Sequence, residues 1–253
     1  MNNTRKEEIN AYIQERGEVR LEELLKLFPG VSAMTIRRDL DALEQDYEIV
    51  RTRGGAKSIA FLSNRTKEEE YIKKVETNMR EKNCIAKKAV SLIKPNSSVF
   101  LDAGSTVMSL AKMIPNEKYH IFTNAPNVAM EVLSRKQSFV HLTGGEINRE
   151  NLSVSGAGSV EFMKNINIDI AFVAASGFSF NNGFSCGNIN DLQLKKVIIE
   201  RAATVVMLMD SSKIGRNMPY TFARLSDIDI LPSDGKLPQK FIEQAADEGV
   251  KIL

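Results

Sequence analysis

The stretch VSAMTIRRDLDALEQDYEIVRTRGGA, from Val31 to Ala56, carries the clearest structural pattern in the amino-terminal part of the chain. Ser32 has the side chain of an N-cap residue and precedes a helical pattern. Apolar residues recur there at helical spacing, at Ile36, Leu40 and Leu43. Residues 49–53 alternate as a strand does, and Gly54-Gly55 permits a sharp reversal. The stretch therefore predicts a helix through Leu43 followed by a β-hairpin.

Two further helices are expected before this stretch. Thr4 lies three residues before Glu7, as in a capping box, and apolar positions follow at Ile9, Tyr12 and Ile13. After Gly17, a second helical pattern stops at Pro29-Gly30 and has its apolar positions at Leu21, Leu24, Leu25 and Phe28. Residues 1–60 are thus expected to form three short helices and a hairpin.

The charges of residues 1–60 nearly balance, with ten basic and eleven acidic side chains. That balance alone argues against a nucleic-acid-binding surface, which depends on clustered cations. The cations are concentrated, however, in two short basic stretches that contain Arg37, Arg38, Arg51, Arg53 and Lys57. One face of this part can therefore be basic.

The whole chain has 253 residues, of which 43% are hydrophobic and 26% charged. This composition excludes disordered, collagen-like and low-complexity proteins, and at roughly 150 residues per domain the length fits one large domain or two. The longest apolar runs, residues 170–175 and 205–209, are far too short to cross a bilayer, and the amino terminus has no signal-peptide core. We expect a globular, cytoplasmic protein without a membrane partner.

The two cysteines and two histidines give no sign of a metal site, a disulfide framework or a cofactor. Cys84 and Cys186 are far apart in unrelated contexts and are expected to be packing residues. His120 and His141 lie in apolar, strand-like runs without a carboxylate-rich neighbourhood, which favours a structural role.

Residues 61–82 are polar and pair Glu69 with Lys73 and Glu70 with Lys74 at helical spacing, which predicts a linker and connecting helix. In residues 83–253, apolar strand-like runs alternate with helical ones from Ser98 onward. Such alternation predicts a layered, mostly parallel α/β sheet. The chain is therefore expected to have a small amino-terminal domain and a larger α/β domain.

Polar or glycine-rich turns follow the predicted strands, at residues 102–106, 123–126, 143–146, 176–177 and 210–213. Because the carboxyl ends of strands in an open α/β sheet line one crevice, these turns are expected to form a pocket. The turn Gly104-Ser105-Thr106 opens a helix and suits a phosphate, but a turn that only allows close packing fits the sequence equally well.

Two aspartate–lysine pairs lie in the same part of the chain. Asp191 and Lys195 are spaced for an ion pair on one helix, with a solvent-exposed pair of little energetic consequence as the favoured interpretation. Asp210 and Lys213 follow an apolar strand, where the lysine could orient a phosphorylated or hydroxylated ligand. A structural aspartate with satisfied hydrogen bonds is the alternative for Asp210.

With TIRRDL placed before RTRGGA, the first 60 residues resemble the winged helix-turn-helix of the DeoR family of bacterial transcriptional regulators. The resemblance continues through LDAGST, TNAPNVA, LTGGEINRENLSVSG, DSSKIGR and SDIDIL, which are similar to the DeoR sensor domain. That domain is similar in fold to sugar-phosphate isomerases and coenzyme-A transferases. The resemblance covers nearly the whole chain.

The resemblance implies a repressor of sugar-metabolism genes that binds double-stranded operator DNA as a homo-oligomer, dimer or tetramer, under control of a phosphorylated sugar. It places DNA-binding residues on the third helix and the wing, at Ser32, Thr35, Arg37, Arg38, Arg51 and Arg53. It places effector-binding residues at Lys82, Asp102, Gly104, Ser105, Thr106, Asn124, Gly144, Gly145, Lys195, Asp210 and Lys213.

The chain departs from the family pattern in several places. Tyr47 stands where a turn glycine is common, and Arg53 replaces the histidine usual in the wing, which adds a permanent cation. Ala175-Ser176-Gly177 lacks the aspartate often found before that glycine. These departures bear on operator geometry and on the identity of the effector.

Two alternatives stand beside the repressor. An isomerase or deaminase-like enzyme acting on a sugar phosphate could use the same crevice, with Asp102 and Asp210 as its carboxylates. No histidine or paired-glutamate site is expected near them, and the amino-terminal 60 residues would have no role in such an enzyme. A DNA-binding protein whose sensor has lost its ligand also fits the departures.

Overall fold

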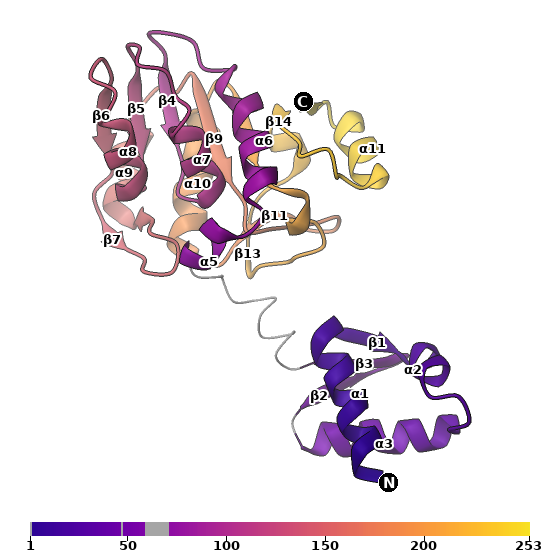
Figure 1. The fold of residues 1–253 in the computed structure, drawn as a ribbon. Coiled ribbons are helices and arrows are strands. Elements are labelled where there is room, and N and C mark those ends of the chain that lie inside the picture. The colour runs from indigo at the N-terminus through magenta and orange to yellow at the C-terminus, as the bar shows by residue number, and fades with distance from the viewer. Residues whose placement is uncertain (1, 47, 59–70) are drawn as a thin grey trace. The chain divides into compact units, whose positions relative to one another are not determined.

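The computed structural model describes residues 2–46, 48–58 and 71–253, and the chain divides into two compact units, Met1–Lys67 and Glu68–Leu253 (Figure 1). We call the first unit the head and the second the sensor unit. Three residues named in the sequence-based expectations lie outside the described residues: Tyr47, Glu69 and Glu70.

The described part of the head has three helices and a three-stranded antiparallel sheet of order β1-β3-β2. Its elements are α1 (Asn2–Arg16), β1 (Glu18–Arg20), α2 (Leu21–Leu27), α3 (Ala33–Gln45), β2 (Ile49–Thr52) and β3 (Gly55–Ser58). Six of the ten predicted apolar positions form its core, with side chains at most 2% exposed: Ile9, Ile13, Leu24, Ile36, Leu40 and Leu43. The other four are partly buried against that core: Tyr12, Leu21, Leu25 and Phe28. The three helices and the hairpin are confirmed.

Two details of the head differ from the expectation. Helix α1 begins at Asn2, so Thr4 lies inside its first turn and the predicted cap at Thr4 is wrong. Strand β1 was not expected, and it explains Gly55. A Cβ at Gly55 would lie 1.9 Å from the carbonyl oxygen of Val19 in β1, so only glycine allows this close approach.

The sensor unit contains a seven-stranded sheet of order β15-β14-β12-β9-β4-β5-β6, in which all neighbouring strands run parallel. Its strands are β4 (Ser98–Leu101), β5 (His120–Thr123), β6 (Phe139–Leu142), β9 (Ile170–Ala174), β12 (Val205–Leu208), β14 (Ile230–Leu231) and β15 (Lys251–Ile252). These are the strands predicted from the alternating pattern, and the mostly parallel α/β fold is confirmed.

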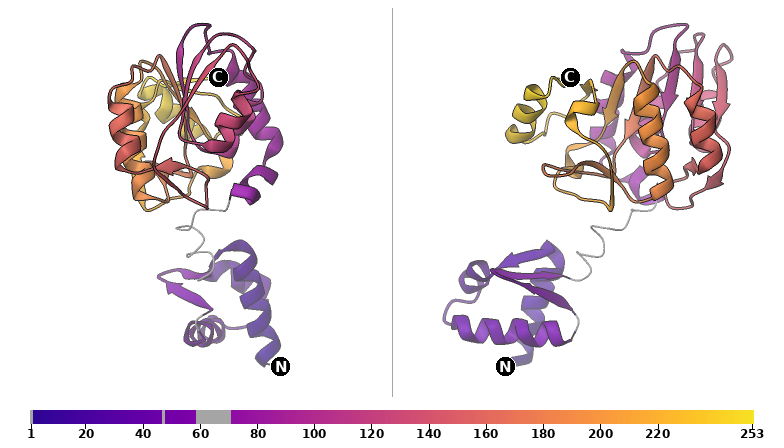
Figure 2. Two further views of the ribbon diagram at one scale, coloured as in Figure 1. Left: turned by 90° about the vertical axis from the view of Figure 1, so that its left-hand side faces the viewer. Right: turned by 180° about the vertical axis from the view of Figure 1, so that it is seen from behind.

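Helices cover both faces of this sheet (Figure 2). One face carries α6 (Met79–Val90), α7 (Ser105–Ala111) and α8 (Pro126–Val132). The other face carries α9 (Ala157–Lys164), α10 (Ile189–Arg201) and α11 (Gln239–Asp247). None of the helices in the described part of the chain has the length and hydropathy of a membrane-spanning segment.

Short elements complete the sensor unit. Helix α5 (Tyr71–Glu76) precedes α6, and β7 (Glu146–Ile147) pairs with β8 (Val154–Ser155). A small antiparallel sheet consists of β10 (Gly177–Ser179), β11 (Gly183–Cys186) and β13 (Tyr220–Ala223). Single 3-10 turns span Ser211–Lys213 and Leu225–Asp227. The antiparallel elements, each two to four residues long, were not predicted.

The order of strands identifies where a ligand site is expected. From β4 the chain adds β5 and β6 on one side, whereas β9, β12, β14 and β15 extend the sheet on the other. The direction in which successive strands are added to the sheet therefore reverses between β4 and β9. In open α/β sheets, ligands bind outside the carboxyl ends of the strands at such a reversal.

Candidate functional site

Helix α3 presents a basic face at its amino-terminal end. Ser32 is its N-cap, and its Oγ accepts a hydrogen bond from the backbone N–H of Thr35 at 3.2 Å. Arg37 and Arg38 are exposed, whereas Ile36, Leu40 and Leu43 form the buried stripe that fixes the helix to the core. Met34 lies beside them with 72% of its surface exposed, and the sequence interpretation did not single it out.

The two predicted wing arginines lie in different environments. The guanidinium of Arg51 donates hydrogen bonds to the carboxylate of Asp41 and to the carbonyl oxygen of Arg37, which holds Arg51 on α3. Its backbone N–H also donates to Glu44 Oε1 at 2.8 Å. Arg53 is exposed in the turn between β2 and β3. The wing thus presents Arg53 outward and uses Arg51 to join the hairpin to α3.

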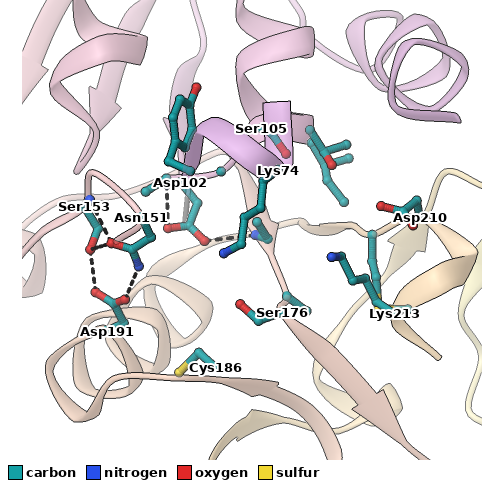
Figure 3. A pocket seen from close by; sticks show the side chains of 18 of the residues that line it. Lys74, Asp102, Ser105, Asn151, Ser153, Ser176, Cys186, Asp191, Asp210 and Lys213 are labelled. Atoms are coloured by element: carbon teal, nitrogen blue, oxygen red, sulfur yellow. Dashed lines mark hydrogen bonds between the residues drawn. The ribbon is translucent and has the colours of Figure 1, made fainter. Parts of the chain in front are cut away.

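A cavity lies in the sensor unit at the carboxyl ends of β4, β9 and β12, where the strand order reverses (Figure 3). It is lined by Tyr71, Lys74, Lys82, Asp102, Ala103, Gly104, Ser105, Thr106, Asn151, Ser153, Ala174, Ala175, Ser176, Cys186, Asp191, Lys195, Leu208, Met209, Asp210 and Lys213. The turns after β4, β9 and β12 converge on it.

A buried ion pair links the two central strands below this cavity. Lys195 Nζ, on α10, donates to Asp102 Oδ2 and to the carbonyl oxygen of Ala174 at 2.9 Å. The carboxylate of Asp102 also accepts the backbone N–H groups of Ala103, at 2.8 Å, and Ala174, at 2.9 Å. Asp102 is 0% exposed and Lys195 6%. Burial has the largest single effect on the pKa of Lys195 and lowers it, but the negative charges of Asp102, Cys186 and Asp191, with the hydrogen bond to Asp102, together leave that pKa raised.

Asp191 is held by residues that the sequence interpretation did not identify. Its carboxylate accepts hydrogen bonds from Asn151 Nδ2, at 2.6 Å, and from Ser153 Oγ, at 2.8 Å, both in the loop between β7 and β8. Burial raises the pKa of Asp191, and the charge of Lys195 opposes this rise. The prediction of an exposed Asp191–Lys195 pair is wrong, because both side chains are buried and the lysine hydrogen-bonds to Asp102.

Asp210 and Lys82 both brace the rim of the cavity. Asp210 Oδ1 accepts hydrogen bonds from the backbone N–H of Ser212, at 3.1 Å, and from Asn78 Nδ2, at 3.2 Å. Lys82 Nζ donates to the carbonyl oxygen of Lys74, within α5, and to that of Thr77, directly after α5. These bonds fix α5 and the 3-10 turn 211–213 beside the cavity.

Lys74 and Lys213 extend into the cavity from different sides, as Figure 3 shows. Both side chains are half-buried. With Lys82 and Lys195, they make four lysines against three aspartates in the lining. The hydroxyl groups of Ser105 and Ser176 lie around them, and Thr106 also lines the cavity. The cavity therefore combines an excess of positive charge with hydrogen-bonding groups, which suits an anionic, hydroxylated ligand.

Three predicted effector residues do not line this cavity. The carbonyl oxygen of Asn124 accepts a hydrogen bond from Val154 N at 2.6 Å, and that of Gly144 accepts one from Ser159 Oγ. Gly145 has φ 147°, and a Cβ there would lie 2.5 Å from the carbonyl oxygen of Ser155. The structure uses all three to seat the β7–β8 hairpin and α9.

The cysteines and histidines differ from each other in placement. Cys186 is buried and lines the cavity, whereas Cys84 is half-buried elsewhere. His120 and His141 are exposed and stack with aromatic rings on β5 and β6. Among the described residues, no three side chains of the metal-binding types are grouped to hold a metal ion.

Comparison with known proteins agrees with both units. A model of the DeoR-like helix-turn-helix domain matches residues 5–60, and a model of the DeoR C terminal sensor domain matches residues 77–235. In fold, 55% of the chain is similar to 56% of a ribose 5-phosphate isomerase A from Methanocaldococcus jannaschii, with a TM-score of 0.41 and 19% identity.

Relatives extend over most of the chain. The HTH-type transcriptional regulator GlpR of Haloferax volcanii is 33% identical over 88% of this chain and 87% of its own length. The glycerol-3-phosphate regulon repressor of Escherichia coli K12 is 28% identical over 95% of this chain and 94% of its own length. The chain belongs to the DeoR family of HTH-type transcriptional regulators.

Proposed function

We propose that this protein represses genes of sugar or sugar-phosphate metabolism and is released from operator DNA by a small phosphorylated sugar. The observation that carries the proposal is the cationic, hydroxyl-rich cavity at the strand-order reversal, in a chain whose head has a recognition helix with two exposed arginines. The relative that represses a glycerol-3-phosphate regulon supports a phosphorylated effector.

In the proposed complex with DNA, the amino-terminal end of α3 enters the major groove. Arg37 and Arg38 donate to base edges or phosphates there, and Ser32 and Thr35 lie at the start of the helix. Arg53, exposed at the wing turn, reaches the phosphate backbone or the minor groove. Arg51 acts on DNA through the orientation of the wing, because Asp41 holds its guanidinium.

In the proposed effector complex, the phosphate lies between Lys74 and Lys213, which extend into the cavity. Ser105 and Thr106 donate hydrogen bonds to it, and the sugar hydroxyls bond to groups such as Asn151 and Ser176. The buried pair of Lys195 and Asp102 holds β4 and β9 in register beneath the ligand.

Release from DNA requires only that the effector bind the DNA-competent and DNA-incompetent arrangements of the protein with different affinities. A sugar phosphate that binds the DNA-incompetent arrangement more tightly shifts the population away from the operator, by no more than that difference allows. A protein that reads paired half-sites is also a homo-oligomer. Effector-driven release and homo-oligomerisation are both parts of the proposed function.

The contacts of the carboxylates weigh against an enzyme in this crevice. Asp102 is fully buried and already accepts hydrogen bonds from two backbone N–H groups and Lys195, and Asp210 caps a 3-10 turn. A general base must instead be positioned to take a proton from substrate. Turnover of a phosphorylated sugar by the purified protein would restore the enzyme hypothesis.

The first test is fluorescence anisotropy of the full chain on its own upstream DNA and on a scrambled duplex. We expect much tighter binding to the upstream DNA, and equal affinity for the two duplexes would reject sequence-specific regulation. A thermal-shift screen of fructose, galactose, tagatose, glucosamine and glycerol phosphates then identifies the effector. A sensor that has lost its ligand would give no shift with any of them.

A further inference from the structure

Large apolar side chains gather at the β6 end of the sensor sheet. Met130 and Leu133, on and just after α8, are 70% and 55% exposed, and Phe139 and Leu142 of β6 are 54% and 45% exposed. Phe162 on α9 is 39% exposed. We call these five residues, with the exposed His141 of β6, the β6 edge patch. Figure 1 shows β6 at the margin of the sheet.

The patch wraps around both faces of the strand. On the α9 face, rings stack across β5 and β6: His120 with Phe139 at 5.1 Å, and Phe122 with His141 at 4.7 Å between centroids. Phe122 also contacts the ring of Phe162, at 6.4 Å. On the other face, Val140 packs into the core beneath α8, whose outer side carries Met130. Helix packing therefore leaves both faces of β6 partly uncovered.

The backbone of β6 is open on its outer side. Phe139 N donates to Tyr119 O at 2.9 Å and Thr143 N to Thr123 O at 3.0 Å, so these N–H groups face β5. Val140 and Leu142, which alternate with them, direct their backbone groups away from β5. No described strand pairs with that outer side. The strand sequence Phe-Val-His-Leu has no proline, lysine or acidic residue to prevent pairing with another strand.

We infer that the β6 edge patch is a dimerisation surface, occupied by the same patch of a second copy of this chain. A twofold axis at β6 brings two identical strands together antiparallel and continues the sheet across the dimer. None of the six side chains carries a fixed charge, so within the patch the twofold places no like charges opposite each other. That feature favours a second copy over a partner selected by charge.

The apolar side chains of the patch supply a large part of the area that this occupant needs. At roughly 200 Å² for each large apolar side chain, the exposed fractions of the five apolar residues amount to about 500 Å² per copy. A stable interface needs about 800 Å² per partner. The two exposed histidines and the open strand edge supply additional surface. The role of such a dimer rests on the proposed function, because two paired heads would read two paired half-sites of an operator.

Sedimentation velocity of the full chain without DNA tests the inference. We expect the wild type to be a dimer or a multiple of one, and Leu142→Glu to weaken the dimer at least about tenfold, because a carboxylate would be buried in the interface. Ile189→Glu is the matched control, since Ile189 is 44% exposed outside the patch and Leu142 is 45% exposed. Circular dichroism checks that both variants keep the fold.

Chemical crosslinking tests the same surface without relying on a variant that fails to associate. His141→Cys, in a chain with Cys84→Ala and Cys186→Ala, should be crosslinked into dimers by a short bismaleimide, whereas Lys164→Cys in the same chain should not. A monomeric wild type, or a Leu142→Glu variant that associates like the wild type, would overturn the inference. Both readouts omit DNA, so a failure here is distinct from equal binding to upstream and scrambled duplexes.

Discussion

Replacement of Lys195 by methionine should strongly destabilise the sensor unit. Methionine fills a similar volume but leaves the carboxylate of Asp102, which is 0% exposed, without its cation. Removal of one partner of a buried ion pair costs about 3–5 kcal/mol because the remaining charge is uncompensated. At roughly 2–4 °C per kcal/mol for a domain of this size, the unfolding temperature should fall by about 10 °C.

Differential scanning calorimetry of the full chain measures this change. Lys196→Met is the control, since Lys196 is exposed on the same helix and should have little effect. Adding Asp102→Asn to Lys195→Met should restore part of the lost stability, because the buried charge is removed. Because the folded-state pKa of Lys195 is raised, the pair stabilises at neutral pH and loses its effect only as alkaline pH passes that pKa. An unchanged unfolding temperature in Lys195→Met would show that the buried ion pair does not stabilise the sensor unit.

Three further predictions concern the head and the cavity. Gly55→Ala should destabilise the head by about 1–3 kcal/mol, because its Cβ would meet the backbone of β1, whereas Gly54→Ala, with nothing within 4 Å, should not; chemical denaturation of both distinguishes them. Asp191→Asn should gain stability relative to the wild type as pH rises above about 4, because burial raises the pKa of Asp191 and disfavours its charged form; a difference in melting temperature that does not vary with pH would contradict this. Arg37→Ala and Arg38→Ala should each weaken operator binding. Each should also reduce the slope of log binding constant against log salt concentration by about 1 for each DNA phosphate that the variant no longer neutralises. Salt titrations with wild-type slopes would exclude these two arginines from the interface.

The sequence predicted what local patterns determine. The N-cap at Ser32, the buried stripe of α3 and the seven parallel strands follow from periodicity and turn residues close together in the chain. The convergence of the turns after β4, β9 and β12 also follows, because parallel strands end at one edge. These features could be predicted without knowing which distant residues pack together.

The sequence could not predict partners set by tertiary packing. Lys195 has a carboxylate four residues away at Asp191, yet it hydrogen-bonds to Asp102, 93 positions away, because β4 and β9 are neighbours. Likewise, Asn151 and Ser153 reach Asp191 only through the β7–β8 hairpin, which is too short to leave a pattern. Arg51 had a wing-like context, but Asp41 holds it on α3.

The most direct test of the account is release of a preformed complex. The full chain is bound to labelled upstream DNA, and the sugar phosphate found in the thermal-shift screen is titrated while anisotropy is recorded. We expect the sugar phosphate to release the wild type and Lys164→Ala, an exposed control in the sensor unit, whereas Lys213→Ala should stay bound to DNA. Release of Lys213→Ala at wild-type effector concentrations, or a wild-type complex that no phosphorylated sugar dissociates, would contradict this expectation.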